Sequence, residues 1–507
     1  MLLIIYMENL IVKITKLFEK HKKSPKTIEK LTYYIEKQLP ALLEKYDAQE
    51  KRRIYLERES NRYINSFLSH SEYQYFYIKS TDTFIEYNGC DYKIIPEDNL
   101  WFKILNDITE KKTLLEWKQK IKSKIIENIK TKKLLISIPE SQTIQNMINF
   151  FTPILFSNKE KVKYFFAVIG DNILGKSSQY NYFVQEKSKE FFEILENLSG
   201  YYFENKLNIS NNFKFKYRGQ SYLNSRLIYF KNNIKNKSIW FSFIKENFLN
   251  FIVLCSHYST RYINAENYAL QRNELFKKEI FYLKHNSKEE IINTFIEKFT
   301  YQDLSSKIHS SDMQFLWNMF LKEKNIENII YKVELENILR NKLNYNSGHY
   351  LNLNTSHGNK IIIFKKFFEN YIIYDDDDEL EISEIHKILE TKNECNISEN
   401  LLEELINHYT SYQSEDGKTI KNISCKLWNK QLEILESFEN KFNKPDTIQN
   451  NTGNYISIYD AYILYCKYSN NNNKILTVSK KYFEKYIIKL IPNEFLWNNN
   501  ILIKYWS

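Results

Sequence analysis

Residues Gly170–Ser177 read Gly-Asp-Asn-Ile-Leu-Gly-Lys-Ser, and this stretch decides between two folds for the centre of the chain. It fits the phosphate-binding pattern G-x-x-x-x-G-K-[ST] at every fixed position. In that loop, backbone N–H groups and the lysine hold the phosphates of a nucleotide, and the hydroxyl binds Mg²⁺. Because the chain has only 9 glycines among 507 residues, composition alone explains the match poorly. The nucleotide-binding candidates are Gly170, Gly175, Lys176 and Ser177, with Mg-ATP as the implied cofactor.

The residues around this stretch favour a helix end instead of a loop. A functional phosphate loop follows a strand and opens a helix. Here residues 157–160 read as a capping box, which begins a helix. An apolar face then repeats at helical spacing through Val162, Phe165, Phe166, Ile169 and Ile173. We therefore interpret Gly175 as a left-handed helix cap, with the phosphate loop as the alternative, and we expect the next strand at Tyr180–Val184.

The composition is typical of an intracellular protein with several domains. Lys, Asn, Ile and Tyr dominate while Gly and Pro are rare, a bias that an AT-rich genome produces. Lys and Arg outnumber Asp and Glu by 72 to 62, and the resulting charge of +10 favours a polyanionic partner. The 5 cysteines are scattered without metal-ligand spacing, so we expect neither disulfides nor a metal site. No run approaches 18 apolar residues, so we expect no membrane span and no membrane partner.

Three regions make up the first part of the chain. Residues 1–70 read as helices rich in Lys, Arg and Glu. Residues 71–135 predict a β-hairpin with Asn88-Gly89 as a type I′ turn, followed by a basic helix over residues 109–133. The lysines of that helix form either a solvated face or a surface that tracks phosphates. Residues 136–370 read as a central, mostly helical domain. Four apolar residues of the basic helix can face a core: Leu115, Ile121, Ile125 and Ile129.

A second basic segment lies inside the central domain. Residues 213–218 alternate aromatic and cationic side chains, and the cations are Lys214, Lys216 and Arg218. An exposed strand with this alternation would stack bases and pair with phosphates. A half-buried strand with a solvated cationic face fits the same pattern, and we favour that interpretation. The three cations are candidate nucleic-acid contacts.

The last third of the chain predicts two winged-helix-like domains, each a helix-turn-helix followed by a β wing. The first spans residues 371–445 and contains the acidic run Asp375–Asp378, which we interpret as a solvated boundary between domains. Ser398 caps its presumed recognition helix, Glu399–His408. The acidic residues of that helix would repel phosphate, so we assign it to packing or to contacts with other proteins.

The second winged-helix-like domain spans residues 446–507 and is basic. Ser479 caps its presumed recognition helix. Phe483, Tyr486 and Ile487 are expected to face inward. The exposed positions carry the cations that a helix in a nucleic-acid groove requires. These candidate phosphate contacts are Lys480, Lys481, Lys485 and Lys489.

Three stretches carry a resemblance to viral proteins. They are the aromatic hairpin of residues 75–94, the helix of residues 161–174 and the C-terminal segment of residues 457–486. On these stretches the chain resembles an uncharacterised protein family of mimivirus-like giant DNA viruses and, more remotely, the superfamily-three viral primase-helicases. The resemblance implies that a phosphate loop should follow the strand Tyr180–Val184, where residues 185–188 contain no glycine. It therefore implies a helicase-like core without its ATP site.

We predict a multi-domain α+β protein, mainly α-helical with small β units and C-terminal winged-helix-like domains. Its predicted function is nucleic-acid binding in a large DNA virus, as an ATPase-deficient helicase-like factor in replication or transcription. Other viral proteins are expected partners of the acidic domain, and the expected location is the host cytoplasm, the virus factory or the virion. No nucleophile–base pair favours an enzyme, and no cofactor is expected. Two alternatives stay open: an active phosphate-loop NTPase and a non-enzymatic virion or virus-factory scaffold.

Overall fold

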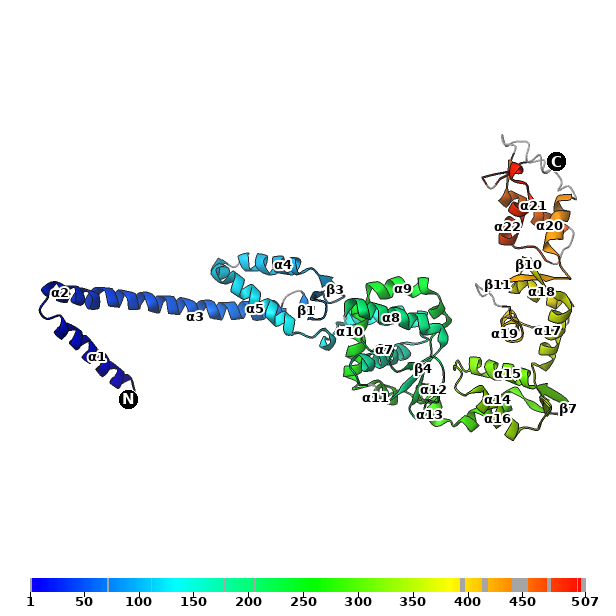
Figure 1. Ribbon diagram of the computed structural model, residues 1–507, viewed down its shortest axis with the longest axis horizontal. Helices are drawn as coiled ribbons and strands as arrows, with labels where there is room; N and C mark the ends of the chain where they lie inside the picture. Colours follow the sequence, from blue (N-terminus) through cyan, green and yellow to red (C-terminus); the bar gives the residue numbers. More distant parts are fainter. Residues whose placement is uncertain are drawn as a thin grey trace. The chain divides into compact units, whose positions relative to one another are not determined.

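The computed structural model describes residues 2–70, 73–110, 112–176, 179–203, 207–392, 397–412, 418–439, 455–471, 476–498 and 500–502. Within these residues the chain is mainly α-helical with small sheets, which confirms the predicted fold class (Figure 1). It divides into two compact units. Unit 1 comprises Met1–Ser287 with Asn325–Ile329, and unit 2 comprises Lys288–Lys324 with Ile330–Ser507.

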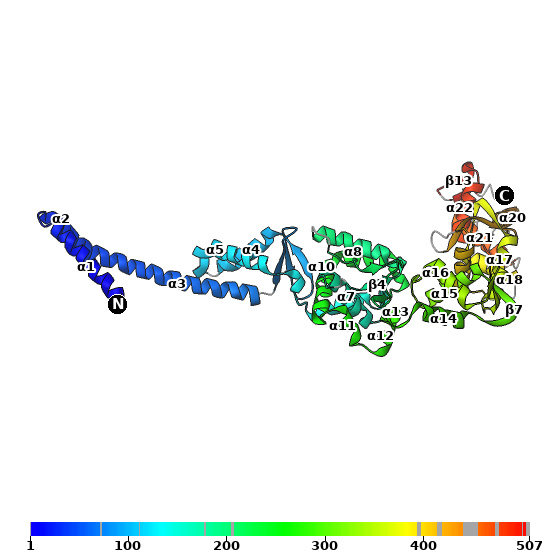
Figure 2. The same ribbon diagram turned by 60° about the horizontal axis from the view of Figure 1, so that its bottom comes forward.

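Unit 1 begins with a series of helices. They are α1 (Leu2–Lys20), α2 (Pro25–Tyr33), a π-helical turn (Tyr34–Gln38) and α3 (Leu39–His70). Pro25 at the first position of α2 suits the fixed φ and the missing N–H of proline. Both views show α3 as one long helix (Figures 1 and 2). Only its later residues, Tyr63 and Ile64 among them, enter a core with the sheet that follows.

That sheet is an antiparallel meander of β1 (Gln74–Ile78), β2 (Thr83–Tyr87) and β3 (Tyr92–Ile95), in the order β1-β2-β3. The predicted hairpin is confirmed, but its turn differs. Pairing stops at Tyr87 and Tyr92, so the connection has four residues, and Gly89 alone in it has a positive φ. The Asn88 carboxamide oxygen accepts the backbone N–H groups of Cys90 and Asp91, at 2.9 and 2.8 Å. This side-chain turn replaces the type I′ turn.

The basic segment that follows is not one helix. It consists of the end of α4 (Glu97–Glu110), a 3₁₀ turn (Lys112–Trp117) and α5 (Lys118–Thr131). Ile121, Ile125 and Ile129 are buried as predicted, whereas Leu115 is exposed and Leu114 is buried in its place. The reason is the tighter winding of the 3₁₀ turn, which shifts the inward face relative to an α-helix.

The remainder of unit 1 surrounds a small parallel sheet. The sheet has the order β5-β4-β6, and β4 confirms the strand predicted at Tyr180–Val184. Its strands are β4 (Asn181–Val184), β5 (Phe213–Lys214) and β6 (Ser225–Ile228). The helices are α6 (Ser141–Ile154), α7 (Lys159–Ile173), α8 (Lys189–Tyr202), α9 (Lys237–Glu246), α10 (Phe248–Arg261), α11 (Ala265–Leu270), α12 (Glu274–Ile280) and α13 (Tyr282–His285). Helices α7 and α10 are buried over most of their length and form the centre of the core.

In the part of the chain that the structure describes, no single helix has both the length and the apolar composition of a membrane span. One consecutive pair, α9 and α10, reaches this length and apolar composition only when the two helices are taken together across a bend of 81°.

Unit 2 repeats one order of elements three times: helix, strand, helix, helix, and then one or two strands. The first repeat is α14 (Lys288–Phe299), β7 (Tyr301–His309), α15 (Ser310–Glu323), α16 (Lys332–Lys342), β8 (Tyr345–Asn346) and β9 (His349–Asn354). The second is α17 (Gly358–Tyr371), β10 (Ile372–Glu381), α18 (Ile382–Lys392), α19 (Glu399–Tyr409) and β11 (Thr419–Cys425). The third is α20 (Lys430–Glu439), β12 (Tyr455–Ser457), α21 (Ile458–Asn471), α22 (Lys480–Leu490), β13 (Leu496–Trp497) and β14 (Asn500–Leu502).

The first and third repeats also share their strand order. In each sheet the last strand lies between the first and the middle one, as β7-β9-β8 and as β12-β14-β13. The second repeat shows the corresponding pair, β10-β11. Sequence reasoning recognised the second and third repeats but assigned the first to the central domain. The first was missed because β7 exposes most of its side chains and lacks the alternation of apolar and polar residues that marks a half-buried strand.

Candidate functional sites

The stretch that matches the phosphate loop is the end of α7. The helix continues through Ile173, and Gly175 has a φ of +68°. The N–H of Lys176 donates to the carbonyl of Asp171 at 2.8 Å, and the N–H of Gly175 donates to that of Asn172 at 3.2 Å. These two bonds with a left-handed residue between them are the Schellman cap.

The predicted helix cap is therefore confirmed, and the phosphate-loop geometry predicted as its alternative is wrong. The N–H groups of Gly175 and Lys176 are bonded to carbonyls of their own helix, so they do not form a phosphate cradle. Gly170 is an internal residue of the helix instead of the first residue of a loop. Ser177, the proposed Mg²⁺ ligand, lies outside the described residues.

Gly170 has a packing role between α7 and α10. A Cβ atom added to it would lie 2.0 Å from the backbone oxygen of Cys255 and 2.7 Å from the Cβ of Ser259. Such distances are far below van der Waals contact, so the two helices approach at a point where only glycine fits. The first glycine of the motif is explained by this close approach.

The lysine of the motif joins a buried polar cluster at the same helix end. Asp171 accepts the Ser259 hydroxyl at 2.6 Å and the backbone N–H of Ala265 at 2.7 Å. The Lys176 ammonium donates to the Ser259 hydroxyl at 3.1 Å and to the Ile263 carbonyl at 3.2 Å. Burial raises the pKa of Asp171 to about 6, although these hydrogen bonds and the lysine act in the opposite direction. The cluster ties α7 to the turn between α10 and α11.

This carboxyl group predicts a pH dependence of stability. Because its pKa is raised in the folded state, its contribution to stability is complete below about pH 4, the unfolded value, and is lost as the pH rises through about 6. We expect chemical unfolding to show a loss of up to about 3 kcal/mol across this range. The Asp171→Asn variant should lack this part of the pH dependence. A variant whose unfolding free energy followed the wild-type pH curve would contradict the assignment.

The basic segment of β5 has its aromatic rings turned into the core. Phe213 is buried with its ring centroid 4.4 Å from that of Phe192, and Phe215 packs on the same ring at 5.8 Å. The inward-facing rings are therefore confirmed, although only Phe213–Lys214 of the predicted strand is a strand. Phe213 and Phe215 are not a surface for stacked bases. The cations have local partners, since Lys214 donates to a backbone carbonyl at 3.3 Å and Lys216 lies 3.2 Å from Glu186. Arg218 is exposed.

Helix α22 has the two faces that the sequence predicts. The Ser479 hydroxyl caps it by accepting the N–H of Tyr482. Phe483 and Ile487 are buried, and Tyr486 is half-buried. The four candidate cations are all exposed: Lys480, Lys481, Lys485 and Lys489.

The acidic run of the second repeat lies against this helix. Pairing of β10 with β11 is interrupted between Tyr374 and Glu379, and residues 375–378 form the interruption. Lys485 lies 2.8 Å from Glu379, and Lys489 lies 3.5 Å from Asp377. Asp376 and Asp377 are exposed, as expected of a solvated run, whereas Asp378 and Glu379 are buried. The run belongs to strand β10 instead of a linker. Two of the four candidate phosphate contacts are therefore already paired with carboxylates of the same chain.

The other two cations lie at the first turn of α22. Lys480 is 3.6 Å from Glu484 and 4.5 Å above the ring of Tyr459. Both contacts are made at the surface, where ion pairs are weak and exchange readily with other anions. Lys481 is exposed. The start of α22 is thus the part of the predicted interface that remains most accessible.

A contact that the sequence did not reveal recurs at both junctions between repeats. Lys365 in α17 lies 2.7 Å from Asp312, the third residue of α15. Lys430 in α20 lies 2.5 Å from Glu384, the third residue of α18. Each lysine also lies 4.4 Å above a tyrosine ring in the third helix of its own repeat, Tyr409 or Tyr482. The first helix of one repeat therefore docks on the second helix of the repeat before it, in the same way twice.

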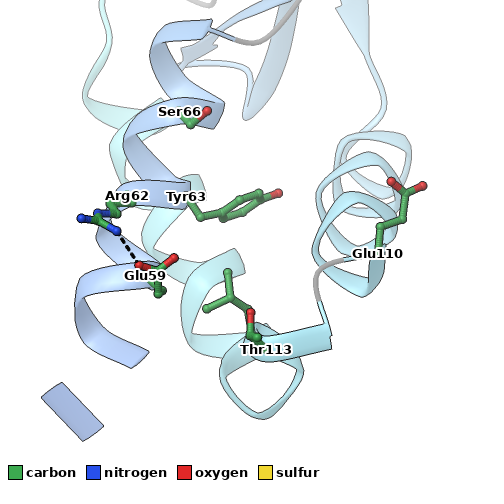
Figure 3. A pocket seen from close by; sticks show the side chains of 7 residues that line it. Glu59, Arg62, Tyr63, Ser66, Glu110 and Thr113 are labelled. Carbon is green, nitrogen blue, oxygen red and sulfur yellow. Dashed lines mark hydrogen bonds and ion pairs between the residues drawn. The ribbon is translucent and has the colours of Figure 1, made fainter. Parts of the chain in front are cut away.

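An open groove of about 510 Å³ lies beside α3 in unit 1 (Figure 3). Its charged side chains include Arg62, which is paired with Glu59 at 2.8 Å, and Glu110. The Tyr63 hydroxyl in its wall donates to Asp107 at 2.6 Å. Arg62 pairs with Glu59 and Tyr63 with Asp107, and neither contact is a nucleophile–base arrangement.

The described residues also hold no metal centre. Among them, no three His, Cys, Asp or Glu side chains converge as ligands. Cys90, Cys255, Cys425 and Cys466 are free thiols. Burial raises the pKa of the Cys255 thiol, which makes it a poor nucleophile.

Comparison with known proteins gives no relative. No protein-family model, no curated protein and no solved structure matches this chain.

Proposed function

We propose that this protein binds nucleic acid through unit 2. The observation that carries the proposal is the element order of its repeats, in which a helix-turn-helix is followed by two strands in the first and third repeats and by β11 in the second. This is the order of winged-helix domains, whose third helix enters a groove of the duplex. In helix-turn-helix proteins the first residues of that helix reach the base edges.

Among the three third helices, the charge of α22 suits a phosphate backbone best. It carries four lysines and one acidic residue, Glu484. The corresponding helix α19 begins with Glu399 and carries further acidic residues, and Glu404 is paired with Lys322 of the first repeat. These features support a division of roles, in which α22 contacts nucleic acid and α19 packs within the chain.

The first turn of α22 provides the initial contact. Lys480 and Lys481 lie where a recognition helix meets the groove, and their local partners are few and exposed. Lys485 and Lys489 would contribute only after exchanging Glu379 and Asp377 for phosphates. This pairing limits the affinity that the helix can reach.

The proposal includes the absence of nucleotide hydrolysis at residues 170–177. The Schellman cap at Gly175 supports it, because the cap uses the N–H groups that a phosphate would need. Together with the resemblance to primase-helicases, this favours an ATPase-deficient helicase-like factor in the replication or transcription of a large DNA virus.

A salt titration of duplex binding tests the proposal. We expect Lys480→Glu/Lys481→Glu to weaken binding by about 10-fold or more and to reduce the slope of log K against log salt by about 2, since each phosphate contact contributes about 0.9. The measurement is fluorescence anisotropy with labelled duplex and single-stranded DNA and RNA.

The matched control is Lys366→Glu/Lys387→Glu, which makes the same charge change at exposed positions of α17 and α18. This variant should retain most of the affinity and the slope. Equal losses in both variants would show that only net charge matters and would overturn the assignment to α22. Wild-type binding that vanished at physiological salt would overturn the proposed function itself.

A further inference from the structure

The first helices of the chain expose an unusual amount of apolar surface. None of the described side chains of residues 7–55 is buried. Of the 35 large apolar side chains exposed in the described residues, 13 belong to this short segment. They are Met7, Leu10, Ile11, Val12, Leu17, Tyr33, Tyr34, Leu39, Leu42, Leu43, Tyr46, Ile54 and Tyr55. We call this set the N-terminal apolar surface.

This surface is not explained by packing within the chain. Only the later part of α3, from Leu56 onward, buries side chains, and Tyr63 and Ile64 pack with the first sheet and α5. The earlier part, Leu39–Tyr55, continues the same helix with exposed apolar residues at helical spacing. Most helices in proteins are stabilised by packing of an apolar face. Contiguous exposed apolar surface of this kind marks an interaction site.

The amount of surface suits a protein interface of standard size. Each of the 13 side chains exposes between 46 and 63% of its surface. With roughly 150–250 Å² for each large aromatic side chain and less for the aliphatic ones, the sum is on the order of 1,000 Å². A stable interface buries about 800 Å² on each partner. One copy of the segment therefore carries enough apolar area for one complete interface.

The form of the segment favours a second copy of the chain as the partner. Helix α1 and the continuous α2–α3 helix are joined by a short turn at residues 21–24, so they make a helical hairpin with unburied apolar residues on both arms. Two such hairpins complete a four-helix bundle, in which each arm buries its apolar face. A twofold pair uses the same patch on both copies.

Charge does not decide between a protein and a lipid surface as the partner. Residues 7–55 carry 12 Lys and Arg and 7 Asp and Glu, and helices that lie on membranes also carry Lys and Arg on their polar face. The choice of a second copy therefore rests on the area and the form of the segment, and vesicle flotation tests the lipid alternative.

We propose that residues 7–55 are a self-association element through which two copies of this chain form a four-helix bundle. The proposal is independent of nucleic-acid binding by unit 2. It would make the protein bivalent, because each copy brings its own unit 2 to the dimer.

Light scattering on the full-length chain tests the proposal. At micromolar concentration we expect a mass of about twice the 61.5 kDa of one chain. The variant Leu42→Glu/Leu43→Glu/Tyr46→Glu should have the mass of one chain, because charged side chains cannot be buried unpaired in the bundle core. On dilution, wild-type helicity at 222 nm should fall as the dimer dissociates, since these helices have no internal partner.

A control places two such charges elsewhere on the surface. Leu223→Glu/Leu304→Glu replaces two apolar residues that are 62 and 85% exposed, and it should leave the dimer intact. A monomeric wild type would overturn the proposal. If that monomer also floated with vesicles of phosphatidylcholine and phosphatidylserine, the partner of the apolar surface would be a lipid surface instead of a second copy. A dimer that persisted in the triple variant would place the contact elsewhere and would also overturn the proposal.

Discussion

The variant Gly170→Ala is expected to destabilise unit 1 by on the order of 3 kcal/mol, the upper range for overpacking a core. The added Cβ would lie 2.0 Å from the backbone oxygen of Cys255. Because the obstructing atom belongs to the backbone of α10, no side-chain rotation can remove the clash. Helices α7 and α10 would have to move apart within the largest core of the chain. Urea unfolding followed by circular dichroism measures the loss.

The second glycine of the motif is the matched control for this prediction. At Gly175 a Cβ would meet no atom within 4 Å, and the cost of Gly175→Ala comes only from its φ of +68°. That cost is about 1–2 kcal/mol. A Gly170→Ala variant as stable as wild type would contradict the helix contact. If Gly170→Ala instead lost a Mg-ATP affinity that the wild type possessed, this loss would support the phosphate-loop alternative.

The variant Lys430→Met is expected to destabilise unit 2 by about 3–5 kcal/mol, as removal of one member of a buried ion pair does. Lys430 is 1% exposed and donates to Glu384 at 2.5 Å and to the backbone carbonyl of Glu379 at 2.7 Å. Burial already raises the pKa of Glu384, and Lys430 opposes this shift. Without the lysine, a carboxylate would be left buried with one oxygen that already lacks a hydrogen-bond partner.

Two comparisons isolate this effect. Removing the charge of the carboxylate as well, in Lys430→Met/Glu384→Gln, should restore most of the stability, and the single variant should be less impaired at acid pH, where Glu384 takes up a proton. At the equivalent junction Lys365→Met should cost less, because Lys365 is 33% exposed and its pair is partly solvated. Thermal unfolding of the full chain measures all three variants. Equal losses at both junctions would contradict the role of burial.

The features that the sequence determined are local. The caps at Gly175, Ser398 and Ser479 form as predicted because each depends on hydrogen bonds between residues a few positions apart. The buried and exposed faces of α22 follow from its 3.6-residue period in the same way. The turn between β2 and β3 differs from its prediction even at this short range, since Asn88 uses its side chain where a backbone turn was expected.

The sequence by itself therefore determined the helical class of this protein and the caps and faces of its main helices. Only the tertiary structure decided that Gly170 is a contact point with α10 and that Lys485 pairs with a glutamate 106 positions earlier in the chain. It also decided that a lysine–carboxylate pair occurs at both junctions between repeats. The first repeat, whose strand β7 is polar, is identified only by the pairing of β7 with β9. The physical reason is that periodicity and capping act over a few residues, whereas ion pairs and helix contacts depend on which distant segments the packed core brings together.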